Sequence, residues 1–138
     1  MGGMPKLPDY LDHGQHLVFC GTAARTTSAA RGHYYSGSGN EFWQYLFDSG
    51  LTPQRLTPAD DVTITTLGIG LTELAKNAAA SNDRGLAGAY DIFGFTQKIE
   101  EYSPTIVAFH GKEAAKHVSR HLEWGQKVGL GLQPWRIT

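Results

Sequence analysis

Short apolar segments alternate with helical patterns along this chain, and this alternation constrains the fold more than any other feature. The segments HLVFC, GIGLT and TIVAFH have the length and apolar content of buried strands; they span residues 16–20, 68–72 and 105–110. Helical spacing of apolar residues occurs at residues 40–49, 90–102 and 112–122. Because strands that alternate with helices favour right-handed crossovers, the sequence predicts an α/β fold with a parallel sheet.

Turn and capping residues predict the remaining boundaries. The side-chain oxygen of Asn40 can cap the helix that begins there. Two Thr-Pro pairs, at 52–53 and 57–58, each predict the start of a short helix. Residues 77–88 are small, polar and aperiodic, which predicts a mobile loop, and residues 126–138 predict one or two further strands.

Length and composition narrow the class of protein. A chain of 138 residues is long enough for one domain with a real core, and we place that domain at residues 16–138 after an extension at 1–15. The chain has no apolar run long enough to span a membrane, and its start lacks the basic-then-apolar pattern of a signal peptide. Cys20 is its only cysteine, so no internal disulfide is possible. We therefore expect a monomeric cytoplasmic protein. The formal charge of −1 means that any nucleic-acid binding would need a local basic face.

The stretch after the first predicted strand is the strongest candidate for a binding loop. Residues 21–39 show no periodicity, and long irregular loops in compact domains are usually functional. In parallel sheets, ligands bind beyond the carboxyl ends of the strands, which here are the segments after Cys20, Thr72 and His110. The loop and the residue after it carry cationic, aromatic and amide groups that suit a nucleotide: Arg25, Arg31, His33, Tyr34, Tyr35 and Asn40. Packing of the aromatic rings in the core is the alternative.

Several motifs in order resemble the mismatch-specific uracil/thymine DNA glycosylases of the uracil-DNA glycosylase superfamily. The similarity covers GTAARTTSAARGHYYSGSGNEFW, LFDSGLTPQRL, GIGLTEL, FHGK and GLGLQPWRI, and so almost all of the chain past residue 15. The resemblance implies a three-layer α/β/α sandwich around a central, mostly parallel sheet. It implies a monofunctional DNA repair enzyme that needs no metal or cofactor, flips uracil out of DNA and hydrolyses its N-glycosidic bond.

The resemblance also assigns a base pocket. Tyr35 matches the aromatic residue on which the flipped base stacks, and Asn40 matches the amide that reads the pyrimidine edge. Tyr34, Thr22 and Ala23 are the neighbours expected to line the same pocket. For Asn40, a role as a helix cap remains open and is compatible with base recognition.

One departure from the family affects the chemistry. Family members carry Gly-Ile-Asn-Pro-Gly after the first strand, and the asparagine positions the attacking water, whereas this chain has Ala23 at that place. A carboxylate or hydroxyl elsewhere would have to hold the water or stabilise the developing sugar cation. Thr22 and the pair Asp60-Asp61 are the predicted catalytic groups, with Glu41 and Glu73 as further candidates. A solvated turn is the alternative for the aspartate pair.

Three cations are predicted to contact DNA phosphates. Arg25 and Arg31 lie in the long loop, and Lys112 lies at a helix start, where amide donors and a cation together can hold a phosphate. His117 and His121 have the spacing of metal ligands, but a solvated helix face is the expected explanation. No metal site is predicted.

The family's last strand and the loop that enters DNA would follow Thr138, so we expect both to be missing from this sequence. A truncated or partly ordered product and a protein without that loop are both compatible with this sequence.

Two functions stay open: a uracil-DNA glycosylase, possibly acting on uracil mispaired with guanine, and a catalytically weak relative that binds nucleic acid or a nucleobase.

Overall fold

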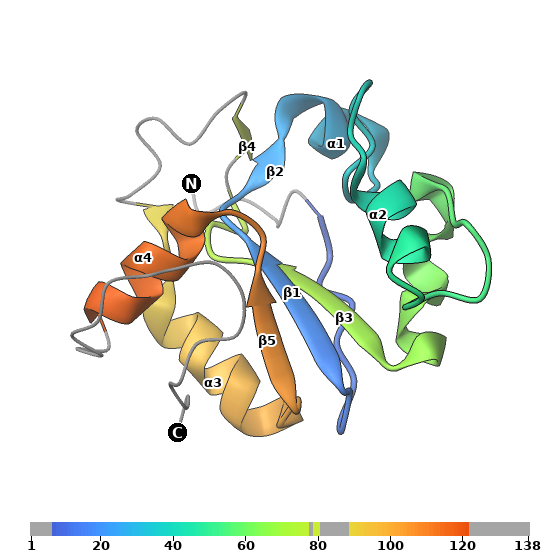
Figure 1. Cartoon of the computed structure of the whole chain (residues 1–138). Helices are drawn as coiled ribbons and strands as arrows, with labels where there is room; N and C mark the ends of the chain where they lie inside the picture. The colour runs from blue at the N-terminus through green and yellow to red at the C-terminus, as the bar shows by residue number, and fades with distance from the viewer. Residues whose placement is uncertain (1–6, 78, 81–88, 122–138) are drawn as a thin grey trace.

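The computed structural model describes residues 7–77, 79–80 and 89–121. Its centre is an all-parallel sheet of three strands in the order β3-β1-β5 (Figure 1). Strand β1 spans Leu17–Gly21, β3 spans Ile69–Glu73 and β5 spans Ile106–Phe109. All three fall where the apolar segments predict strands, and their parallel pairing confirms the predicted α/β fold.

Helices cover both faces of this sheet. Helices α3 (Ile92–Tyr102) and α4 (Lys112–His121) lie on one face, and α2 (Phe42–Asp48) lies on the other with the 3-10 helix η1 (Pro58–Leu67) (Figure 1). Two clusters of buried side chains fill the spaces between the layers. The α2 side holds Tyr34, Phe42, Trp43, Leu46, Ile64, Ile69 and Leu71, and the α3 side holds Cys20, Leu74, Ile92, Phe95, Ile99, Ala114 and Val118. The helical predictions at 40–49, 90–102 and 112–121 are confirmed.

The segment after β1 is more regular than its sequence predicts. Strand β2 (Ala24–Arg25) pairs in parallel with β4 (Ala79–Ala80), and helix α1 (Thr26–Arg31) follows β2 directly. The prediction of an irregular loop over residues 21–39 is therefore wrong for its first half. A run rich in Thr, Ser and Ala carries no apolar periodicity, so its sequence does not reveal a six-residue helix.

The two Thr-Pro pairs behave differently. At Thr57-Pro58 the threonine forms a capping box with Asp60, and η1 begins at Pro58 as predicted. At Thr52-Pro53 the prediction of a helix is wrong, since residues 51–54 form bends. The Thr52 hydroxyl donates to the carbonyl of Gln54 at 2.8 Å and does not accept a helix N–H.

The residues before β1 pack onto the domain. Tyr10 forms an isolated antiparallel bridge with Leu71 of β3, and the side chain of Leu7 is 1% exposed. Residues 78 and 81–88 of the predicted loop at 77–88 lie outside the described residues, and so do the strands predicted at 126–138. Within the described part of the chain, no helix is long and apolar enough to cross a membrane.

Candidate functional site

The carboxyl ends of the three central strands meet at one edge of the sheet. Gly21 at the end of β1 lies opposite Glu73 at the end of β3. On the other side, the backbone N–H of His110 donates to the carbonyl of Cys20 at 2.8 Å. Glu73, Gly21 and His110 are therefore level across the sheet, at the edge where parallel sheets bind ligands.

The ring of Tyr35 lies over this edge. Its centroid is 4.0 Å from that of Phe42 and 4.7 Å from that of His110, and the Phe42 and His110 rings are 5.7 Å apart. Because a linear stack would hold the outer rings much further apart, the three rings form a compact triangle. A Cβ placed on Gly21 would lie 3.6 Å from the Tyr35 hydroxyl, so the hydroxyl end of the ring lies over the glycine. Tyr35 has a φ of 52°, a left-handed conformation that is uncommon for a large side chain.

A buried clamp holds the backbone next to Tyr35. The carboxylate of Asp61 accepts the backbone N–H of Tyr34 at 2.9 Å and contacts Nδ1 of His33 at 3.1 Å. The indole N–H of Trp43 donates to the carbonyl of Tyr34 at 3.1 Å. With both polar groups of residue 34 held, the surrounding structure maintains the unusual conformation of Tyr35.

The neighbouring Tyr34 belongs to the core. Its side chain is 1% exposed, its hydroxyl donates to the carbonyl of Pro8 at 2.7 Å, and it accepts from Nζ of Lys76 at 2.9 Å. Burial, and next the charge of Glu73, raise the pKa of this hydroxyl above its ordinary value. The predicted contact of Tyr34 with a base stays a prediction, and its burial does not favour it.

Three other predicted pocket residues lie near the same edge. Asn40 is exposed, and its carboxamide oxygen accepts the backbone N–H of Phe42 at 3.0 Å, so the cap predicted for this side chain is present. Thr22 and Ala23 are buried, directly after β1. The methyl group of Ala23 packs with Ala75 in a small apolar cluster, where it cannot orient a water molecule. Base recognition by these residues stays a prediction.

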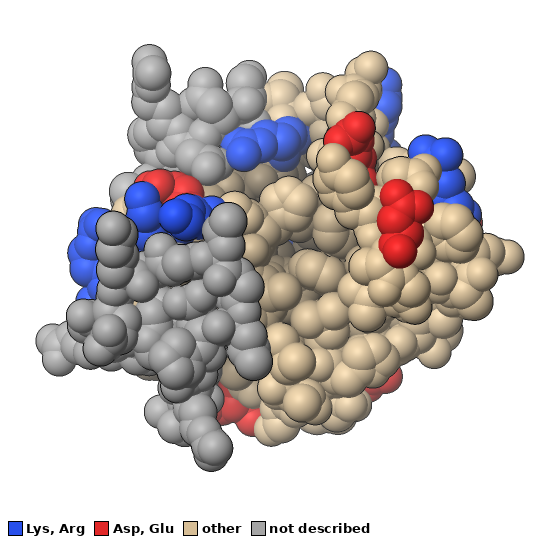
Figure 2. Space-filling view, in the orientation of Figure 1, with Lys and Arg blue, Asp and Glu red and all other residues tan. Residues whose placement is uncertain are grey.

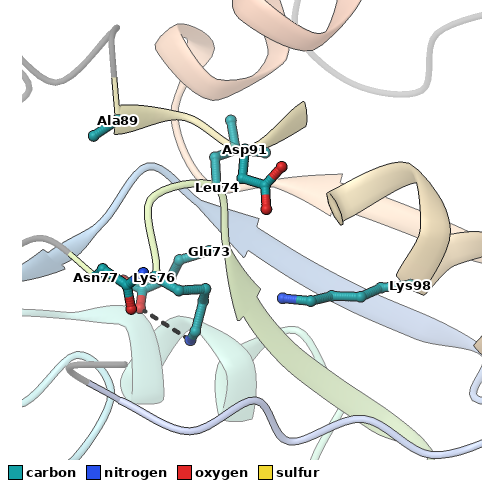
Figure 3. Close-up of a pocket in the computed structure, with 7 residues that line it drawn as sticks. All are labelled: Glu73, Leu74, Lys76, Asn77, Ala89, Asp91 and Lys98. Atoms are coloured by element: carbon teal, nitrogen blue, oxygen red, sulfur yellow. Dashed lines mark ion pairs between the residues drawn. The ribbon is translucent and has the colours of Figure 1, made fainter. Parts of the chain in front are cut away.

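Glu73 is the buried acid of the edge. It lines a pocket of about 290 Å³ together with Leu74, Lys76, Asn77, Ala89, Asp91 and Lys98 (Figure 3). Its side chain is buried, and it forms an ion pair with Nζ of Lys76, which lies 3.5 Å from Oε1. Burial raises the pKa of Glu73 to about 7, although the charge of Lys76 opposes this rise.

The other candidate acids have local structural contacts. Asp60 completes the capping box by accepting from the backbone N–H and the hydroxyl of Thr57, and these bonds lower its pKa. Asp61 is fully buried under the loop that it clamps. Glu41 accepts a hydrogen bond from the hydroxyl of Tyr45, one turn further along. The catalytic roles predicted for Asp60 and Asp61 remain predictions, and Glu73 is the one of the four that ends a strand of the central sheet.

Sequence comparison assigns this architecture to a family. The family model described as the uracil DNA glycosylase superfamily matches residues 8–135. The chain belongs to the uracil DNA glycosylase superfamily. Membership indicates an activity of the DNA glycosylase type, a hydrolase that acts on the bond between base and sugar in DNA. A parallel sheet with helices on both faces agrees with this membership.

The cations expected to bind DNA in this glycosylase-type domain are all exposed. Arg25 lies in β2, Arg31 ends α1, and Lys112 begins α4. Arg31 donates to the carbonyl of Ser36, which ties α1 to the loop that carries Tyr35. Figure 2 shows separate groups of basic side chains along the upper part of the face seen in Figure 1, with acidic side chains between them, above a largely uncharged centre.

Metal ligands do not cluster in the described part of this superfamily member. No group of three or more His, Cys, Asp or Glu side chains there is arranged to hold a metal ion. His117 instead contacts Glu113 at 2.9 Å, one turn away on α4. The side chain of His121 lies outside the described residues.

The sequence does not predict one contact residue of the site. Its pattern places His110 at a strand end and gives it no contact, yet its ring packs against Tyr35. Its position directly after an apolar strand and before Gly111 was the available signal, because that is where parallel sheets bind ligands.

Proposed function

We propose that this superfamily member excises uracil from DNA, including uracil mispaired with guanine, and leaves an abasic site. The observation that carries the proposal is the half-buried ring of Tyr35, clamped over the carboxyl ends of β1 and β5 and beside His110. A base that stacks on this ring would lie next to the buried acid Glu73. Base–aromatic stacking is sequence-tolerant, so selectivity has to come from groups at the edge of the base.

In the proposed reaction, the bond between C1′ of the sugar and N1 of uracil breaks, and both bonding electrons leave with the base. The oxygen of a water molecule bonds to C1′, and that water loses one proton. The uracil anion takes up one proton, so the products are neutral uracil and an abasic sugar. Groups that stabilise the departing anion act mainly in the transition state and therefore raise the rate of the chemical step.

Exposed cations would hold the DNA backbone around this site. Arg25, Arg31 and Lys112 are the residues that we propose for phosphate contacts, because each is exposed on an element that begins or ends near the carboxyl edge. Such contacts release counterions and make binding depend on salt concentration.

A second function is favoured by one observation. Ala23 stands where the family carries its water-positioning asparagine, and its methyl group packs against Ala75. If no other group holds the water, the chain would bind a base or nucleic acid and turn over slowly or not at all.

The test is release of uracil from duplexes that carry one G·U pair, followed by strand cleavage at the abasic site with alkali. We expect the wild type to release uracil and Tyr35→Ala to reduce single-turnover excision about 5- to 150-fold, as expected for loss of a stack of about 1–3 kcal/mol. Tyr45→Ala is the matched control, because Tyr45 is 62% exposed on α2 and should leave excision unchanged. A folded wild type that releases no uracil would contradict the enzyme proposal and leave the binding function.

A further inference from the structure

Glu73 lies on the same face of β3 as the proposed base-stacking ring. Leu71 belongs to the core cluster on the α2 side, against which Tyr35 packs. Side chains two residues apart on a strand point to the same face, so Glu73 projects to the Tyr35 side. Across the ladder Glu73 faces Gly21, and a Cβ on this glycine would be in ordinary contact with the Tyr35 hydroxyl, at 3.6 Å.

The carboxyl group of Glu73 has few hydrogen-bond and charge partners for a buried acid. Its residue is 6% exposed, and Oε1 has no hydrogen-bond partner among the described residues. The nearby ammonium of Lys76 is shared, because its Nζ lies 3.0 Å from Asp9 and 2.9 Å from the Tyr34 hydroxyl but 3.5 Å from Glu73. A buried polar atom without a partner costs stability, so this oxygen at the end of β3, across the ladder from the glycine under the Tyr35 hydroxyl, points to a ligand.

We propose that Glu73, in its protonated form, recognises the lactam edge of the flipped base. This inference rests on the proposed excision of uracil. A neutral carboxyl group has one O–H donor next to one carbonyl acceptor. Uracil carries a carbonyl next to the N3–H group, so the acid O–H donates to the base carbonyl and the acid C=O accepts from N3–H. The same pairing suits other bases with adjacent C=O and N–H groups, such as thymine and hypoxanthine.

The same contact would assist the reaction. When the C1′–N1 bond breaks, negative charge develops on the base and spreads to its carbonyl oxygens. A neutral Glu73 that donates to one of these oxygens stabilises this charge, whereas an ionised carboxylate would repel it. Glu73 would then act as an anion-stabilising group, and the neutral form would be the active one.

The environment of Glu73 makes this protonated form available near neutral pH. Burial raises its pKa to about 7; Lys76 and Arg25 lower the pKa, while Asp9 raises it. Lys98 from α3 also reaches Asp9, at 2.6 Å, and so adds positive charge to this network. The Tyr35 hydroxyl stays neutral in this range, since burial and the charge of Glu73 raise its pKa.

The experiment measures both binding and excision from about pH 5.5 to about pH 8.5. The binding probe is a duplex with one 2′-fluoro-2′-deoxyuridine opposite guanine, because the electron-withdrawing fluorine disfavours the sugar cation and slows cleavage. For the wild type, we expect affinity and single-turnover excision to fall as pH rises through about 7, approaching tenfold per pH unit. Glu73→Gln keeps a donor next to an acceptor without a titrating proton, so we expect it to bind and excise with a flat pH profile. Glu100→Gln, an exposed glutamate on α3, should follow the wild type.

Two results would overturn the inference. Wild-type excision that rises with pH, together with loss of excision in Glu73→Gln at every pH, would make Glu73 a general base. Identical pH profiles for wild type and Glu73→Gln would show that Glu73 does not contact the base. Failure of the proposed function gives a different result from failure of this inference. If the protein does not excise uracil, none is released at any pH, but the binding measurement still shows whether Glu73 contacts the base.

Discussion

Two buried acids in this domain have opposite surroundings. Asp61 is fully buried and accepts the backbone N–H of Tyr34 while it contacts His33. Glu73 is also buried, but one of its oxygens has no hydrogen-bond partner among the described residues, and its ion pair with Lys76 is long. Asp61 supports the loop that carries Tyr35, and Glu73 ends β3 opposite Gly21, near the hydroxyl of Tyr35.

The difference shows how burial alone misleads. A buried carboxylate with good donors stabilises the structure, and its contacts explain its presence. A buried acid with few donors costs stability in its charged form, so an explanation has to come from binding or chemistry. We infer that Asp61 is a positioning residue and that Glu73 acts on the base.

Removing the Asp61 side chain tests the first half of this comparison and should have the largest effect. We expect Asp61→Ala to lower the free energy of unfolding by about 2–3 kcal/mol, because the N–H of Tyr34 loses a charged acceptor in a buried site. Urea denaturation measures the change. Asp48→Ala, an exposed aspartate at the end of α2, is the control. A change below about 0.5 kcal/mol would show that the clamp is not needed.

Neutralising Glu73 should have the opposite sign. Its folded-state pKa of about 7 lies above the ordinary value of 4.5, so the wild type loses stability as pH rises from about 4.5 to about 7. Glu73→Gln escapes this loss, and we expect it to be more stable than wild type by about 1–3 kcal/mol at pH 8 and equal to it near pH 4. Denaturation at the two pH values checks this. A variant that is less stable than wild type at pH 8 would mean that the charged form is well compensated.

Replacing Asp60 tests whether this residue is a helix cap or a catalytic group, and the expected change in stability is smaller. Loss of the capping box in Asp60→Ala should destabilise the protein by about 1 kcal/mol and leave excision by the folded protein unchanged. Thermal unfolding and the G·U assay measure the two quantities. A fall in excision of more than about tenfold in folded protein would support the predicted catalytic role instead.

Neutralising the cations proposed to contact DNA phosphates should have the smallest effect. Arg25→Gln and Lys112→Gln should each reduce the slope of log affinity for duplex DNA against log salt by about 0.9. Arg55→Gln is the control, because Arg55 is exposed in the segment between α2 and η1. Slopes that match the wild type would remove these two residues from the DNA interface.

Most of the framework could be predicted from the sequence because its signals are local. Apolar runs of strand length locate β1, β3 and β5, and apolar spacing locates α2, α3 and α4. Helix α1 and the two-residue strands β2 and β4 escaped prediction, since their pairing depends on contacts between segments far apart in the chain.

The site could be predicted only in part. Tyr34 and Tyr35 are adjacent and chemically identical, and only the left-handed backbone at Tyr35 directs one ring into the core and the other over the sheet edge. The sequence offers Glu73 only as one of several candidate acids. Its importance depends on the register that pairs it with Gly21, which no local pattern contains.

The most direct test of the comparison is the titration of the Glu73 carboxyl group itself, followed by carbon NMR with selectively labelled glutamate and assigned with Glu73→Gln. We predict a midpoint at about 7 for the free protein. The midpoint should rise further when the fluorinated uracil duplex binds, because the base edge would stabilise the protonated form, whereas a duplex with cytosine opposite guanine should leave it unchanged. A midpoint near the ordinary value of 4.5, unaffected by the uracil duplex, would contradict the account.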